Sequence, residues 1–234
     1  MAGELWTVHL GLVDYREAYA LQERVRAARQ ADVVPDTLLL LEHPPVYTRG
    51  RRSQPGELAM GEDWYRMQGI DIVDTDRGGK VTYHGPGQLV GYPIMRVGDV
   101  IAYVRTMEQA IVAALAGEGA PGARARPQDG RDFTGVWLGE RKIASIGVHV
   151  AREVTTHGFA VNVDNDLQPF EWVVACGLPD VRMTSITAET RRADHLACFR
   201  RAMAFRFAEA FGRRQRLVTP ARLERALAAA PTPA

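Results

Sequence analysis

Short apolar runs bounded by turn residues predict a set of β-strands. The run LWTVHLG alternates apolar and polar positions, as a half-buried strand does, whereas TLLLL is apolar almost throughout. The predicted strands of this kind lie at 5–11, 37–41, 70–73 and 159–163. Gly135–Leu138 and 142–150 in turn predict a hairpin across Gly139 and Glu140.

Three longer segments carry apolar residues at helical spacing. The first follows Asp14, a suitable N-cap, and runs to about residue 31; the others span 100–115 and 193–211. The residues predicted to form their apolar faces are Ala18, Leu21, Val25, Ala28, Met107, Ile111, Leu115, Leu196, Phe199, Met203, Phe207 and Phe211. Hairpins interspersed with separated helices favour an α+β fold, a mixed sheet with helices packed on one side.

The length and composition favour one domain. The chain has 234 residues, 46% of them hydrophobic and 24% charged, enough for one continuous core. Because no linker is visible, we expect one domain over residues 1–220, followed at 221–234 by the end of a helix and a disordered tail. The alternative is that the chain after about residue 180 forms a minor C-terminal subdomain.

Charge and cysteine content exclude several classes of protein. A net charge of +1 gives no global attraction to nucleic acid, and two distant cysteines make neither a disulfide scaffold nor a zinc cluster. With no signal-peptide pattern and no evident membrane span, we expect a cytoplasmic protein that binds no metal.

Arginines cluster in three places. The clusters are Arg49, Arg51 and Arg52; Arg124, Arg126 and Arg131; and Arg191, Arg192, Arg200, Arg201, Arg213, Arg214 and Arg216. They are either solvated helix faces or a docking surface for an acidic protein.

The segment RGGKVTYHGPGQ at 77–88 is the first candidate for a binding site. Four glycines would let the backbone approach a phosphate or an acyl chain closely. The spacing matches neither a Walker loop nor a dinucleotide fingerprint. A tight turn without a ligand is the alternative.

Lys142 and Cys176 are the candidates for chemistry. Lys142 opens the apolar strand KIASIGVHV, where burial would favour the neutral amine and so a usable base, although an exposed strand-end lysine is the commoner case. Cys176 stands in the turn-like CGLPD, which suits a reactive thiol. Cys198 is instead expected to be a buried residue of the third helix, on the side of Ala202 and Phe205. His157 could be a ligand group or a core imidazole.

Together these segments resemble the octanoyltransferases of lipoate biosynthesis, also called lipoate–protein ligase B. The motifs that carry the resemblance are LEHPPVYTRG (41–50), RGGKVTYHGPGQ (77–88), KIASIG (142–147), HGFAVNV (157–163), CG (176–177) and TSI (184–186). They follow in the family's order over about residues 5–215. Ala175 departs from the proline that many members have before the cysteine, and the arginine-rich segment 121–132 is longer than expected.

The resemblance implies a fold shared with biotin and lipoate protein ligases. It implies octanoyl transfer from acyl carrier protein to a lysine of the lipoyl domains in 2-oxoacid dehydrogenases and the glycine cleavage H protein. The acyl group arrives on the carrier's phosphopantetheine, so no separate cofactor is implied. Cys176 would carry the acyl thioester, with Lys142 as its partner. The substrate contacts that the resemblance implies are Arg77, Gly78, Gly79, Lys80, Val81, Thr82, Tyr83, His84, Ser145, Ile146, Gly147, Gly158, Phe159 and Ala160.

Two other functions remain to be tested. An ATP-dependent lipoate ligase on the same fold would place Lys142 on a phosphate and need no cysteine. A non-catalytic module that binds acyl groups or a carrier protein would keep all its measurable function in the Cys176→Ser variant.

Overall fold

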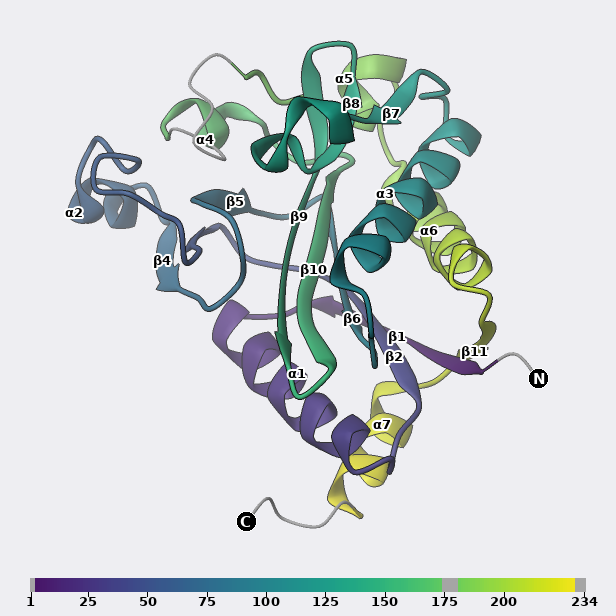
Figure 1. Cartoon of the computed structure of the whole chain (residues 1–234). Coiled ribbons are helices and arrows are strands. Elements are labelled where there is room, and N and C mark those ends of the chain that lie inside the picture. The colour runs from purple at the N-terminus through teal and green to yellow at the C-terminus, as the bar shows by residue number, and fades with distance from the viewer. Residues whose placement is uncertain (1–2, 174–180, 230–234) are drawn as a thin grey trace.

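The structure is a computed structural model that describes residues 3–173 and 181–229. Within them, an eight-stranded sheet has the order β11-β1-β2-β6-β10-β9-β8-β7 (Figure 1). Its strands are β1 (Glu4–Leu12), β2 (Asp36–Glu42), β6 (Gln88–Ile94), β7 (Ala123–Ala125), β8 (Gly135–Leu138), β9 (Arg141–Ala151), β10 (Val154–Asn162) and β11 (Arg214–Leu217). β11, β1 and β2 run parallel, and every later neighbour pair is antiparallel, so the sheet is mixed as predicted.

A second, three-stranded sheet lies beside the first and has the order β4-β3-β5. Its strands are β3 (Val46–Arg49), β4 (Asp71–Asp74) and β5 (Thr82–His84). The helical segments are α1 (Tyr15–Gln30), α2 (Glu62–Met67), α3 (Val100–Gly117), α4 (Gln168–Glu171), α5 (Ile186–Thr190), α6 (Leu196–Ala210) and α7 (Pro220–Ala228), with 3-10 turns η1 (Pro127–Asp129) and η2 (Arg131–Phe133).

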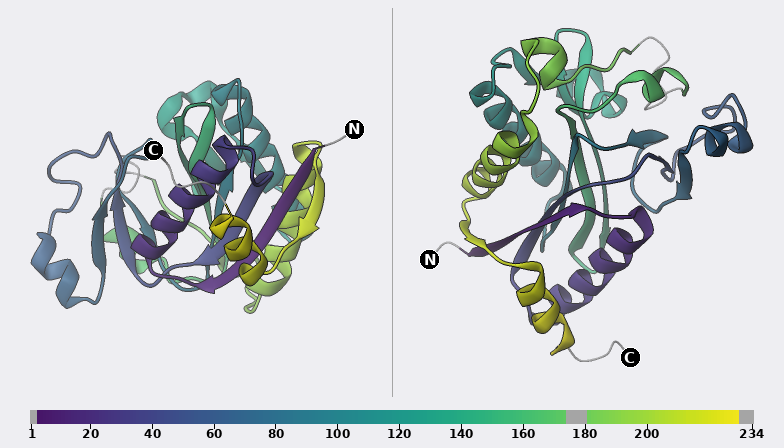
Figure 2. Two further views of the ribbon diagram at one scale, coloured as in Figure 1. Left: turned by 90° about the horizontal axis from the view of Figure 1, so that it is seen from below. Right: turned by 180° about the vertical axis from the view of Figure 1, so that it is seen from behind.

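Helices cover both faces of the large sheet, so the prediction of helices on one side is wrong. α3 and α6 pack on one face and α1 and α7 on the other (Figures 1 and 2). The reason lies in β2, where Leu38 and Leu40 contact the first helix pair while Leu39 and Leu41 contact the second. A strand with apolar side chains on both faces must be covered on both.

The predicted helices form close to their expected bounds. Asp14 caps α1, because its carboxylate accepts hydrogen bonds from the N–H groups of Arg16 at 2.8 Å and Glu17 at 3.3 Å. α3 packs against α6 through Met107, Ile111 and Leu115. Although no membrane span was evident in the sequence, α3 is long and apolar enough to cross a membrane by length and composition. In this structure its buried face, which includes Met107, Ile111 and Leu115, belongs to the core, whereas Ile101 is exposed.

Cys198 corrects another expectation. It is exposed on α6, and the buried face of that helix consists of Phe199, Met203, Ala204, Phe207 and Ala208. Phe205, on the same side as Cys198, is 55% exposed. The prediction therefore assigned to the buried side of α6 positions that are exposed.

The C-terminal third belongs to the same domain as the rest. β11 pairs with β1, and α7 continues past residue 220 to place Leu223 and Leu227 in the core that α1 helps to form. α6 shares a core with α3. The chain is thus a single α+β domain.

Candidate active site

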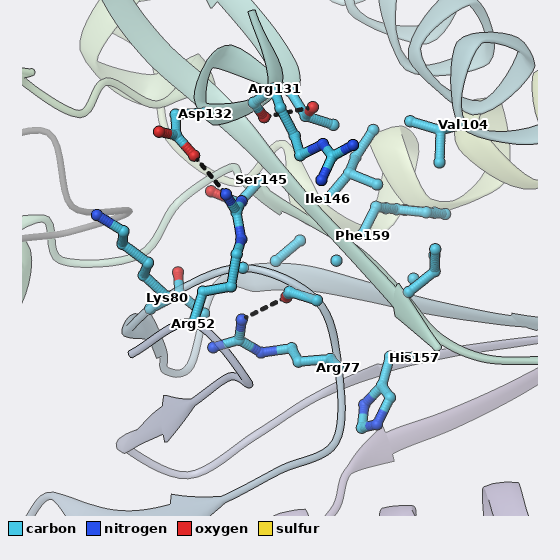
Figure 3. A pocket seen from close by; sticks show the side chains of 18 of the residues that line it. Arg52, Arg77, Lys80, Val104, Arg131, Asp132, Ser145, Ile146, His157 and Phe159 are labelled. Atoms are coloured by element: carbon cyan, nitrogen blue, oxygen red, sulfur yellow. Dashed lines mark hydrogen bonds and ion pairs between the residues drawn. The ribbon is translucent and has the colours of Figure 1, made fainter. Parts of the chain in front are cut away.

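A cavity of about 620 Å³ lies where β9, β10 and β6 meet the loop 77–80, the start of α3 and the loop 130–134 (Figure 3). All the predicted site residues in the described part of the chain line this cavity except Val81 and Tyr83. Segments that are far apart in sequence are therefore brought together as the motifs suggested.

Val81 and Tyr83 face away from the cavity. They pack with Tyr47, Tyr65 and Phe170 beneath the small sheet. Side chains alternate along a strand, so Thr82 and His84 face the cavity while their neighbours enter the core.

Lys142 lines the cavity, and two backbone hydrogen bonds tie it to the segment 182–184. Its N–H donates to the carbonyl of Arg182, and its carbonyl accepts from the N–H of Thr184, both at 2.9 Å. The side chain is only 2% exposed, and Nζ lies 5.3 Å from the centre of the Trp137 ring. A Cβ on Gly135 would lie 2.9 Å from Cε of Lys142, so a glycine at this position leaves room for the lysine stem. Lys142 is therefore a buried amine with a fixed position.

Cys176 lies outside the described residues. The described chain resumes at Val181, and Arg182 and Thr184, which pair with Lys142, follow the cysteine by six and eight positions in the sequence. The sequence thus places Cys176 near a segment that is tied to Lys142.

A buried chain of hydrogen bonds connects the cavity to that segment. Nδ1–H of His84 donates to Oε1 of Gln88 at 2.7 Å, and the Gln88 amide donates to Oδ1 of Asn162 at 2.9 Å. The Asn162 amide donates to the carbonyl of Thr184 at 3.1 Å. Burial lowers the pKa of His84 well below its usual value, so the ring is neutral and Nε2 carries a lone pair.

Arg77, which is 7% exposed, begins the loop 77–80, called here the glycine loop, and holds it in place. Its guanidinium donates to the Thr48 carbonyl at 2.6 Å, to the Thr48 hydroxyl and to the carbonyl of Gly78. These bonds join the loop to β3. Arg77 therefore acts at least in part as a structural cross-link.

Buried His157 pairs with the partly exposed Asp76, and His157 lies beside Val148, six residues along β9 from Lys142. Nε2–H of His157 donates to Oδ1 of Asp76 at 2.7 Å, which leaves Nδ1 facing the Tyr15 hydroxyl at 3.5 Å. His157 adopts a φ of 58°, and its N–H donates to Oε1 of Gln22 at 2.7 Å. The hydrogen bond from His157 lowers the pKa of Asp76, and burial lowers the pKa of His157. His157 lines the cavity, and its buried ring has a polar partner at each nitrogen, so both roles left open by the sequence, a ligand group and a core imidazole, fit the structure.

Several residues near His157 were not predicted from the sequence. Nδ1–H of His43 donates to the carbonyl of Val13 at 2.7 Å, and Nε2 accepts from the Tyr92 hydroxyl at 2.7 Å. Burial lowers the pKa of His43 to about 4. Tyr15 and Tyr92 themselves line the cavity. His43 could have been predicted from its place in the motif LEHPPVY, whereas Tyr15 and Tyr92 stand in none of the motifs.

One side of the cavity is apolar. Val104 of α3, Ile146 of β9 and Phe159 of β10 lie together there, as Figure 3 shows. Glycines keep the adjoining backbones close: a Cβ on Gly158 would lie 2.2 Å from the carbonyl oxygen of Gly91, and one on Gly147 would lie 2.7 Å from that of Gly78. A side chain at either glycine would push backbone apart before it filled the cavity.

The resemblance implies an acyl substrate, and the apolar side is the place that suits its chain, so narrowing this side should shorten the chain that is accepted. We expect Val104→Phe to lower the preference for an octanoyl over a hexanoyl donor by about tenfold, since two methylenes are worth roughly 1.6 kcal/mol of burial. The measurement is the ratio of kcat/KM for the two donors, with Val104→Ala as the widening control. An unchanged ratio in Val104→Phe would place the acyl chain elsewhere.

No group of three or more metal-ligating side chains is found among residues 3–173 and 181–229.

The comparisons with known proteins agree with this arrangement. The family model described as the lipoyl protein ligase A/B catalytic domain matches residues 14–208. An octanoyltransferase of Acidothermus cellulolyticus is 46% identical over 188 residues, covering 79% of this chain and 81% of that protein. An octanoyltransferase of Solibacter usitatus is 51% identical over 173 residues, covering 72% and 76%.

Solved structures with low sequence identity share the fold. A lipoate-protein ligase A bound with ATP superposes with a TM-score of 0.78 at 22% identity, covering 97% of this chain and 93% of that one. A biotin protein ligase from Aquifex aeolicus superposes with a TM-score of 0.51 at 12% identity, covering 89% and 69%. The predicted fold type is thereby confirmed. The chain belongs to the lipoyl protein ligase A/B catalytic-domain family and, within it, to the octanoyltransferases, a group of acyltransferases.

Proposed function

We propose that the enzyme moves an octanoyl group from acyl carrier protein to a lysine of a lipoyl domain, through a thioester on Cys176 with Lys142 as its partner. The lipoyl domains would be those of 2-oxoacid dehydrogenases and the H protein. The observation that carries the proposal is the position of Lys142, a buried amine that lines the cavity and pairs with the segment that follows Cys176 in sequence. A thiol that must stay free requires a reducing compartment such as the cytoplasm.

The first half-reaction exchanges one thioester for another. The Cys176 thiolate attacks the carbonyl carbon of the donor, a new C–S bond forms, and the bond to the carrier's phosphopantetheine sulfur breaks. The Lys142 ammonium favours the attacking thiolate and gives its proton to the departing sulfur. The exchange is close to isoenergetic, so no nucleotide is consumed.

The second half-reaction forms the amide. The acceptor amine attacks the acyl carbon, the C–S bond to Cys176 breaks, and neutral Lys142 takes a proton from the attacking nitrogen. Cys176 and Lys142 then return to their starting states, as thiolate and ammonium. The first step needs Lys142 as an ammonium, and the second needs it as a neutral amine. The proton that Lys142 gives to the departing phosphopantetheine sulfur leaves it neutral for the second step.

The direct test is to locate the acyl group. After mixing with octanoyl carrier protein and no acceptor, the intact protein should gain one octanoyl group, and peptide mapping should find it on Cys176. Cys198→Ser is the matched control and should retain the adduct, because the exposed Cys198 could otherwise react without catalysis. Cys176→Ser should show no thioester.

Two results would contradict the proposal. An acyl group on Cys198, or on no cysteine, would rule out the Cys176 thioester. Turnover that requires ATP would favour a ligase of the kind whose fold this chain shares.

A further inference from the structure

Three segments bring positive charge to the mouth of the cavity. The turn 50–53 supplies Arg51 and Arg52, the glycine loop supplies Lys80, and the loop 130–134 supplies Arg131. Figure 3 shows Arg52 and Arg131 reaching over the cavity from opposite sides. The mouth is therefore cationic, whereas the side formed by Val104, Ile146 and Phe159 is apolar.

Most of this charge is not neutralised within the protein. Asp132 is the one acidic residue among the described residues of the lining, and it pairs with Arg52 at 2.8 Å. Arg105 pairs with the buried Glu108 at 2.6 Å. Within residues 3–173 and 181–229, Arg51, Lys80 and Arg131 form no ion pair with a carboxylate.

The turn 50–53, which carries Arg51 and Arg52, is hydrogen-bonded to the loop 77–80. The N–H of Arg51 donates to the Arg77 carbonyl, and the N–H of Arg52 donates to the Gly79 carbonyl, both at 3.0 Å. A Cβ on Gly50 would lie 2.5 Å from the Gly79 oxygen, so the two segments can meet this closely only at a glycine. The backbone of Arg51 and Arg52 is thus fixed relative to the loop 77–80, which carries Lys80.

We propose that Arg51, Lys80 and Arg131 bind the phosphodiester of the phosphopantetheine arm that delivers the acyl group. The inference rests on the proposed function, which places the thioester near Lys142 with the acyl chain along the apolar side. The rest of the arm must then leave through the mouth, and its one charged group is an anion. Guanidinium and ammonium groups are suited to bind such a phosphate through charge-assisted hydrogen bonds.

The test compares two small donors that differ in the phosphate. They are octanoyl-phosphopantetheine and octanoyl-pantetheine, each used with an apo lipoyl domain as acceptor. The parent should have a kcat/KM about tenfold higher for the phosphorylated donor, as expected for partly exposed charge-assisted contacts. Phosphopantetheine without an acyl group should likewise inhibit the reaction more strongly than pantetheine. Both differences should shrink as salt is raised.

Charge-removing variants then identify the contacts. Arg51→Gln, Lys80→Gln and Arg131→Gln should each lower the ratio of kcat/KM between the two donors, and the triple variant should bring it near one. Arg201→Gln removes one charge from the exposed face of α6, away from the cavity, and should leave the ratio unchanged.

Three outcomes would overturn the proposal. A parent that does not distinguish the two small donors has no phosphate site. Variants that slow both small donors equally act on the chemistry instead. Variants that slow octanoyl carrier protein without affecting either small donor show that the cations contact the carrier's protein surface. A parent that transfers octanoate from no donor would refute the proposed function itself, so the two failures are distinguishable.

Discussion

Lys142→Ala should lose both half-reactions, whereas Lys142→Arg should keep part of the acylation of Cys176 and lose most of the transfer to the acceptor lysine. An arginine keeps the positive charge that favours the thiolate, but it essentially never gives up its proton and so cannot act as a base. General-base catalysis is typically worth about 10²–10⁴-fold, so the transfer defect should be large. Alanine removes the charge and the base together.

The measurement is single-turnover kinetics of each half-reaction, with circular dichroism to confirm that each variant is folded. Because Lys142 is buried against Trp137, Lys142→Met provides a control that keeps the stem without the charge, and it should behave like alanine. Transfer at near the parent rate by Lys142→Arg would show that Lys142 is not the base. His84 and His157, which also line the cavity, would then be the next candidates.

Acid should destabilise this fold well before the carboxylates become protonated. Burial lowers the pKa of His43 to about 4 and also lowers the pKa values of His84 and His157, while the same residues in the unfolded chain titrate near 6.5. Below pH 6.5 the unfolded state therefore binds more protons than the folded state, and the free energy of unfolding falls as pH falls. His43 contributes a loss of roughly 3 kcal/mol between pH 6.5 and 4, at 1.36 kcal/mol per pH unit.

Urea unfolding between pH 7.5 and 4.5 should show this loss as a falling midpoint with an unchanged slope in urea. His43→Gln cannot take up the proton, so its stability should depend less steeply on pH even though the variant is less stable at neutral pH. The paired Asp76 adds to the loss only below about pH 3.8, because its pKa in the folded state is the lower one. A midpoint that stays constant from pH 7.5 to 4.5 would show that these histidines are accessible to protons in the folded state.

The sequence predicted the strongly patterned elements and missed the central strand of the large sheet. β2 was evident because its leucines are consecutive, and α1 because Asp14 precedes a helical spacing. β6 contains Gly91 and Pro93, which usually interrupt strands. Gly91 is needed there for a tertiary reason: a Cβ would lie 2.1 Å from the Phe159 ring on β10. Such a contact between strands is invisible in a local pattern.

The candidate site could be predicted where it coincides with motifs. Three motif segments line the cavity: the glycine loop, the strand that begins near Lys142, and residues 157–160. Each motif places small or reactive residues where two stretches of backbone lie close together. His43, Tyr15 and Tyr92 come from other segments and meet only through packing. Arg131 and Asp132 belong to the arginine-rich segment whose role the sequence left open.

The pairing of β1 with β11 has a consequence for how the chain reaches this fold. Glu4 aligns with Arg214, so the first strand lies beside one that is synthesised more than two hundred residues later. Until Arg214–Leu217 has emerged from the ribosome, residues Glu4–Thr7 of β1 lack the partner strand of the folded protein, and their edge has unpaired N–H and carbonyl groups. Pairing of such distant segments slows folding, because the loop between them must close before the contact forms. We therefore expect this pairing to form late in biogenesis, and we expect the growing chain to be prone to aggregation at this edge until then.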